Sequence, residues 1–351
     1  KKVTFDKAKA LFLAAIRALL PQTPKDSHMR ILQADDLGKT QILSTFPEAW
    51  MAHSQPETGL IWLDLNHSED ISSIEKLLRE QFGFHPLAID DALHETHIPK
   101  LDDWDSYLYM VLQDVVYTAD KHQVDLPEID VFLGKRFLVT YHQQTEAAVD
   151  RVWELCQRNS RWLQHGADHL LYRLIDEIVN NYTAVLELLE SEIVLMESTI
   201  FSDPSPRVLE RLTTYKHTIH HLRRVLVPQR EVVNRLSREL YPVIGANDRI
   251  YFRDVYDHLV RLYDLSDNVR ELVMSNIEIY LAVVNNRMND IMKTLTMMTA
   301  LFMPLTFLTG FFGMNFFQAI LPSTFWTGNT MLIIALVAMV MTPLLMYSWM
   351  R

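Results

Sequence analysis

Polar and small side chains recur at seven-residue intervals along a mostly apolar part of the sequence. One series consists of Glu278, Asn285, Met292, Thr299, Thr306 and Gly313, and a second consists of Asn289, Thr296, Met303 and Gly310. Because seven residues make about two helical turns, each series follows one line along a helix, and the two lines are adjacent. Within a membrane, such a stripe indicates either close helix packing or a water-filled path. Asn285 and Asn289 precede the apolar part, which favours the path.

Several copies of this helix around one axis would form a pore that has no fixed charge within the membrane. Amide, hydroxyl and thioether groups would line it, and this suits hydrated Mg²⁺, which releases water reluctantly and prefers oxygen partners. We expect Met292, Leu295 and Met303 to form apolar constrictions that gate by dewetting. Glu278 is expected at the cytoplasmic entrance, where a ring of carboxylates would concentrate cations. The alternative for Glu278 is an ordinary surface position.

Two other groups of side chains have the chemistry of metal ligands. The carboxylates Asp90 and Asp91 follow His85-Pro86 on a short predicted helix, and Asp254 lies at the start of a much longer one. By residue type alone, ordinary surface carboxylates are the favoured interpretation of all three. Histidines with helical spacing are His94 and His97, His165 and His169, and His217, His220 and His221. Spacing of this kind can place two imidazoles on one face, but no cysteine accompanies them, and we interpret them as structural or solvated.

The helix that carries the stripe must enter a membrane. No Asp, Glu, Lys or Arg occurs between Lys293 and Arg351, although charged residues make up 22% of the chain. Two parts of this segment, 294–312 and 331–350, have full spanning length, so we predict two transmembrane helices joined by an extracytoplasmic loop at 313–330. Basic residues flank both spans on the side of the soluble part. By the positive-inside rule, they place that part in the cytoplasm. We expect the protein in the cell inner membrane.

The soluble part divides into three predicted regions. Residues 1–145 mix strands, near 59–65, 107–117, 130–132 and 137–141, with helices at 68–84 and 86–94, which predicts an α/β domain of unknown strand order. Residues 146–246 are predicted as helices at 146–158, 168–201 and 206–240. Residues 247–293 form a stalk, because no Gly or Pro occurs between 247 and 303. One helix over 254–312, about 90 Å long, would run from the stalk through the first span.

Composition narrows the function. The formal net charge of −11 argues against nucleic acid as a partner. No glycine-rich phosphate-binding motif is present, so we expect passive transport without a nucleotide and no enzymatic activity.

With Gly313-Met314-Asn315 directly after the first span, the sequence resembles the CorA family of two-transmembrane magnesium and cobalt transport proteins. Two further segments carry the resemblance: Tyr251-Phe252-Arg253-Asp254-Val255-Tyr256-Asp257-His258 and Phe302-Met303-Pro304-Leu305-Thr306-Phe307. The resemblance implies a homopentamer with a cytoplasmic funnel of α/β domains, in which Mg²⁺ is both transported and regulatory. It also implies that Gly313, Met314 and Asn315 select the ion. Asp91, or its neighbour Asp90, would bind regulatory Mg²⁺ together with Asp254 of the adjacent subunit.

Two features depart from the family pattern. The connector 316–329 has no acidic residue, although the family usually has some just after the signature, and the basic cluster in which the family tends to end is not found up to Arg351. Zinc transporters of the same fold usually have Ile in place of Met314, so Met314 favours Mg²⁺, with Co²⁺ and Ni²⁺ as further candidates. A membrane-anchored metal-binding protein without a pore is the third hypothesis, and the polar stripe argues against it.

Overall fold

A computed structural model describes residues 29–34, 40–43, 46, 59–66, 71–313 except 95, 97, 121 and 160, and six single residues between 333 and 348. The chain divides into two compact units. The first comprises Lys1–Leu195 with Glu210–Met274, and the second Met196–Leu209 with Ser275–Arg351. Met314, Asn315, the predicted loop and most of the second predicted span lie outside the described residues.

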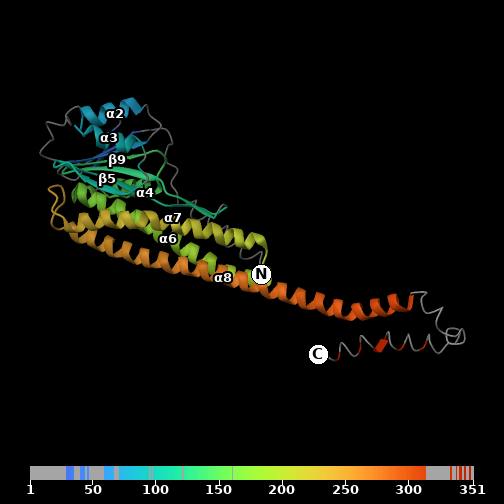
Figure 1. Ribbon diagram of the computed structural model, residues 1–351. Helices are drawn as coiled ribbons and strands as arrows, with labels where there is room; N and C mark the ends of the chain where they lie inside the picture. The colour runs from blue at the N-terminus through green and yellow to red at the C-terminus, as the bar shows by residue number, and fades with distance from the viewer. Residues whose placement is uncertain are drawn as a thin grey trace. The chain divides into compact units, whose positions relative to one another are not determined.

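A seven-stranded sheet in the order β2-β1-β3-β9-β8-β5-β4 is the centre of the first unit (Figure 1). Among its described strand pairs, β3 and β9 run parallel and the others antiparallel. The strands are β1 (Met29–Ala34), β2 (Thr40–Leu43), β3 (Leu60–Asn66), β4 (Lys100–Asp103), β5 (Tyr107–Gln113), β8 (Glu128–Gly134) and β9 (Phe137–His142). A separate hairpin pairs β6 (Val116–Thr118) with β7 (Gln123–Asp125). The sheet with its helices confirms the predicted α/β domain.

The central strands are buried on both faces, which explains why they read as nearly unbroken apolar runs. Alternate residues of β3, such as Leu63, pack with Leu78 of α2 (Ile71–Glu80) and Ile89 of α3 (Pro86–Leu93). On the other face, Trp62 contacts Trp153 of α4 (Ala147–Arg158), with ring centroids 5.0 Å apart. Figure 1 shows α2 and α3 on one side of the sheet and α4 on the other.

Three long helices follow α4 and the short α5 (Arg161–Gln164): α6 (Ala167–Ser202), α7 (Pro206–Arg238) and α8 (Arg249–Gly313). In the first unit, Arg223 of α7 links α7 to α8, because its guanidinium donates to the Tyr263 hydroxyl at 2.9 Å and pairs with Asp267. The single helix expected from stalk to first span is confirmed, and it begins at Arg249 rather than near residue 254.

One face of α8 is buried at alternating steps of three and four residues. The buried positions are Phe252, Val255, Leu259, Leu262, Ser266, Val269 and Val273, and they continue at Asn276 and Tyr280. This spacing has a mean period of 3.5 residues, as in coiled coils. Leu272 is only half-buried and Leu281 is exposed, so these two leucines lie beside the buried face rather than on it.

Among the described residues, one helix, Arg249–Phe311, is long and apolar enough to cross a membrane, and its most apolar window is not buried within the chain.

Candidate ion path and metal-binding residues

All the predicted pore-lining residues lie on α8 in the second unit, and all are exposed. They are Glu278, Asn285, Asn289, Met292, Leu295, Thr299, Met303, Thr306 and Gly310. The exposed fractions of the apolar members are large, with 71% for Met303 and 57% for Leu295. Among the described residues, none therefore covers this stripe, which stays available for a neighbouring helix or for an aqueous path.

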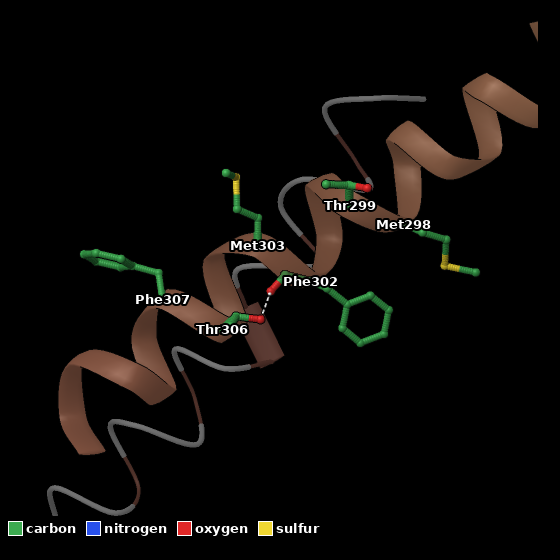
Figure 2. Close-up of a pocket in the computed structure, with 6 residues that line it drawn as sticks. All are labelled: Met298, Thr299, Phe302, Met303, Thr306 and Phe307. Carbon is green, nitrogen blue, oxygen red and sulfur yellow. Dashed lines mark hydrogen bonds between the residues drawn. The ribbon is translucent and has the colours of Figure 1, made fainter. Parts of the chain in front are cut away.

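The threonine hydroxyls of the stripe bind back to their own helix. Thr299 Oγ1 donates to the Leu295 carbonyl at 2.9 Å, and Thr306 Oγ1 donates to the Phe302 carbonyl at 2.9 Å (Figure 2). A hydroxyl has one proton to donate and two lone pairs that accept. Because these protons are already used, both oxygens are oriented as acceptors. Water in the hydration shell of a cation donates hydrogen bonds outward, so this polarity suits a hydrated cation.

Apolar groups surround these hydroxyls. Met298, Thr299, Phe302, Met303, Thr306 and Phe307 line a shallow, open hollow along α8. Figure 2 shows Met303 and Phe307 projecting from one side of the helix, and Met298 and Phe302 from another. The hydroxyl acceptors are therefore spaced between bulky apolar side chains, an arrangement that can narrow a path without placing charge in it.

Gly310 is not required by the fold of the described chain. A Cβ built there would meet no atom within 4 Å. No described residue therefore requires a glycine here. A neighbouring helix or an ion outside the described residues would be a reason for its small size. Gly313 is the last residue of α8.

The short helix α3 holds Asp90 and Asp91 in place through a well-formed N-terminus. Pro86 occupies the first turn, and His85 Nδ1 accepts from the Leu87 N–H at 3.2 Å. The His85 N–H in turn donates to the Tyr107 hydroxyl at 2.9 Å, which ties the helix to β5. The two aspartates at the other end of α3 are thus fixed relative to the sheet.

Asp90 and Asp91 have different surroundings. Asp90 is 70% exposed, and its carboxylate lies 3.2 Å from His94 Nδ1. Asp91 is paired with Lys100 of β4, whose ammonium also lies 3.1 Å from Asp102 and over the ring of Tyr109. Partial burial lowers the pKa of Lys100, but hydrogen bonds to the two carboxylates outweigh it, and the net shift is upward. Asp91 therefore already has a cationic partner, whereas among the described residues the carboxylate of Asp90 is paired with His94 alone.

Asp254 lies in the second turn of α8 and is 65% exposed, with His258 Nε2 at 3.8 Å. The pKa of Asp176 on α6 is raised, mainly by burial, and the negative charge of Asp254 adds to this upward shift. In the described part of a single chain, no three His, Cys, Asp or Glu side chains gather into a metal site. Asp90, Asp91 and Asp254 are thus not brought together within one chain, and a role across subunits stays a prediction.

Sequence reasoning missed Lys100 and Asp176 as neighbours of these carboxylates. Lys100 belongs to β4, a short edge strand without apolar alternation, and Asp176 lies on a different helix from Asp254. Of the histidine pairs, His165 and His169 have ring centroids 4.8 Å apart, and His169 Nδ1 lies 3.0 Å from Asp248. His97 lies outside the described residues.

An α/β domain joined by one helix to an apolar, charge-free span with an exposed polar stripe defines a class: membrane proteins that carry a soluble domain on a transmembrane helix. The sequence pattern of the family described as CorA-like Mg2+ transporter protein matches residues 57–351. The chain belongs to this family, whose members are divalent-metal transporters rather than enzymes.

Individual relatives agree with this assignment. The cobalt/magnesium transport protein CorA of Thermotoga maritima is 30% identical over 287 residues, covering 82% of this chain and 81% of the relative. The zinc transport protein ZntB of Yersinia enterocolitica is 25% identical over 280 residues, covering 79% and 82%. The solved structure of the CorA magnesium transporter from Methanocaldococcus jannaschii has the same fold, with a TM-score of 0.79 at 22% identity, over 93% of this chain and 98% of that one.

Proposed function

We propose that this chain is one subunit of a homopentameric channel that carries Mg²⁺ passively across the cell inner membrane and is closed by cytoplasmic Mg²⁺. Co²⁺ and Ni²⁺ are further substrates under this proposal. The observation that carries it is the exposed stripe on α8, whose hydroxyls face outward as acceptors and whose membrane part has no charge. The cobalt/magnesium transport proteins among the relatives support the choice of ion.

In the pore, Met292, Leu295 and Met303 form the apolar constrictions, and Glu278 attracts cations at the cytoplasmic entrance. Their large exposed fractions support these roles, because a side chain used by its own chain for packing would be buried. Gly313, Met314 and Asn315 form the selective mouth at the far side. There, a ring of Asn315 amide oxygens replaces bulk water around the hydration shell of Mg²⁺.

Regulation involves the carboxylates of α3 and α8. Asp254 meets Asp90 or Asp91 of a neighbouring subunit, and a bound Mg²⁺ turns the repulsion between like charges into a bridge that holds the closed state. The exposure of Asp90 and Asp254 supports their participation, because both remain accessible to another chain. Asp91 would have to exchange Lys100 for the metal.

The test is metal flux into liposomes that contain the pure protein. Mg²⁺ is expected to enter without a nucleotide, with Co²⁺ and Ni²⁺ also admitted, and the detergent-solubilised particle is expected to have the mass of a pentamer. A monomer or dimer without flux would overturn the channel and favour a membrane-anchored metal-binding protein.

A zinc transporter of the same fold is the second candidate, because zinc transport proteins are among the relatives at similar coverage. Zn²⁺ flux that exceeds Mg²⁺ flux in the same liposomes would establish this alternative. Met314 favours the magnesium channel.

A further inference from the structure

Two histidines of α7 line a cavity beside the β6–β7 hairpin, in the first unit. The cavity has a volume of about 400 Å³, and its lining residues are Gln123, Val124, Thr214, His217, Thr218 and His221. Thr214, His217, Thr218 and His221 are spaced by three and four residues, so they form one face of α7. His220 is exposed on the same helix but does not line this cavity.

The walls of the cavity are fixed by hydrogen bonds that do not use the two histidines. Thr218 is only 5% exposed, and its hydroxyl donates to the backbone carbonyl of His122 at 3.2 Å, which anchors the hairpin to α7. The Tyr215 hydroxyl donates to Glu192 of α6 at 2.7 Å, and His122 Nδ1 lies 3.2 Å from the same carboxylate. The imidazole of His122 is therefore occupied, whereas those of His217 and His221 border open space.

Imidazoles four residues apart on one helix can both reach a single metal ion, as in zinc enzymes that bind through a His-x-x-x-His pair. Imidazole nitrogen favours Zn²⁺, Cu²⁺, Ni²⁺ and related ions, whereas Mg²⁺ takes carboxylate, carbonyl or water oxygens. We propose that His217 and His221 form a binding site for a divalent transition metal, with the Gln123 side chain and water as the remaining ligands. This site would not bind Mg²⁺, and it does not depend on the ion that the channel carries.

The site would allow the cytoplasmic part of the protein to respond to transition metals separately from Mg²⁺. It lies where α7 meets the hairpin, so a bound metal adds to the contact made by Thr218. The carboxylates of α3 and α8, by contrast, offer oxygen ligands suited to Mg²⁺. The two kinds of ligand would let one chain distinguish the two classes of ion.

The test is Zn²⁺ binding by the purified full-length protein, measured by equilibrium dialysis with Mg²⁺ in large excess so that oxygen sites are filled. The parent and His220→Ala are expected to bind the same amount of Zn²⁺. His217→Ala and His221→Ala are each expected to lose one equivalent per chain. Co²⁺ added in place of Zn²⁺ should give a visible absorption band that is likewise lost in these two variants.

All three histidines are exposed, so the fold should tolerate each substitution. Thermal unfolding without added metal checks that the variants are equally stable. The proposal is overturned if His217→Ala and His221→Ala bind as much Zn²⁺ as the parent does. It is also overturned if His220→Ala loses as much as they do, because the binding would then be a general property of the helix surface.

Discussion

The Lys100 ammonium lies among the carboxylates near Asp91, which is one of the proposed regulatory residues. Its ammonium pairs with Asp91 and lies 3.1 Å from Asp102, so it occupies space that a metal ion at Asp91 would need. A metal that binds Asp91 must therefore displace Lys100, whereas one that binds Asp90 has no such competitor. In the proposed Mg²⁺-gated channel, Lys100 would thus set how much cytoplasmic Mg²⁺ is required for closure.

Lys100→Met is expected to increase sensitivity to Mg²⁺. Removing the competitor, and its repulsion of a divalent cation, should lower the cytoplasmic Mg²⁺ concentration that halves the current roughly two- to tenfold, given the modest strength of half-exposed ion pairs. The measurement is current through patches held at varied cytoplasmic Mg²⁺. Lys135→Met, at the exposed β8–β9 turn, serves as the control. An unchanged or weaker response to Mg²⁺ in Lys100→Met would contradict this role.

Asn315 is expected to be essential for transport although it lies outside the described residues. Asn315→Ala and Asn315→Leu should nearly abolish Mg²⁺ flux into liposomes and leave the oligomer intact. The physical reason is that losing a ring of amide oxygens leaves nothing to hydrogen-bond the hydration shell. Particle mass in detergent is the control for assembly. Flux at the parent's level in Asn315→Ala would remove this residue from the selective mouth.

The helices and the central strands could be predicted from the sequence because the physics that specifies them is local. Hydrophobic periodicity together with Pro204, Pro206, Pro242 and Gly245 set limits for α6 and α7 that agree with the structure within a few residues. The edge strands β2 and β4 were not predicted, nor was β1, which lies between β2 and β3. β4 has the sequence Lys-Leu-Asp-Asp, and only pairing with β5 makes it a strand.

The beginning of α4 depends on a buried carboxylate from another element. Asp114, which follows β5, accepts the N–H groups of Val115 and Ala148 and both of its oxygens accept from Asn181. The neighbouring Glu146 precedes α4 and is 1% exposed, and its Oε2 has no hydrogen-bond partner among the described residues. Burial, with the charge of Asp114 adding to it, raises the pKa of Glu146 to about 9. Glu146 is therefore protonated in the folded protein at neutral pH.

Glu146→Gln is expected to stabilise the first unit, and more so at higher pH. Between its ordinary pKa and about 9, the folded state holds a proton that the unfolded state lacks, so the wild-type protein loses stability as pH rises. A neutral amide removes this dependence, and the gain should be near zero at pH 4 and up to a few kcal/mol at pH 8. Thermal unfolding at both pH values measures it, with Glu187→Gln on exposed α6 surface as the control. A gain that does not depend on pH would show that Glu146 is ionised.

At the scale of the whole molecule, the proposed gate couples carboxylates in the soluble part to a path on the same long helix. Asp254 and the exposed stripe both belong to α8, so a change at the start of this helix needs no further element to reach the span. In the proposed pentamer, five equivalent interfaces would add their small preferences for the Mg²⁺-bound state, and the sum would strongly favour the closed state.

Asp254→Ala is expected to keep conducting when cytoplasmic Mg²⁺ is high. Without this carboxylate, Mg²⁺ no longer distinguishes the closed from the open assembly, and the current should lose most of its dependence on cytoplasmic Mg²⁺. Asp257→Ala, one turn along the same helix, is the matched control for loss of surface charge. A current from Asp254→Ala that is as sensitive to Mg²⁺ as the parent's would exclude Asp254 from gating.

The seven-residue repeat of α8 also fixes the direction of the stripe relative to the buried face of the same helix. At about 100° per residue, Glu278 points away from the side on which Asn276 and Tyr280 are buried, and each further step of seven residues turns the stripe by only about 20°. The number of residues between the buried positions and the stripe therefore determines the angle between them about the helix axis. Deleting the exposed Ala282 would turn everything after it by about 100° and shorten the helix by only about 1.5 Å.

Inserting seven residues at the same point of the parent helix would change the angle by only about 20° and lengthen the helix by about 10 Å. We expect the deletion to abolish Mg²⁺ flux and the insertion to retain part of it, with particle mass confirming that both variants assemble. If the deletion conducts as well as the insertion, the direction of the stripe has no role in transport.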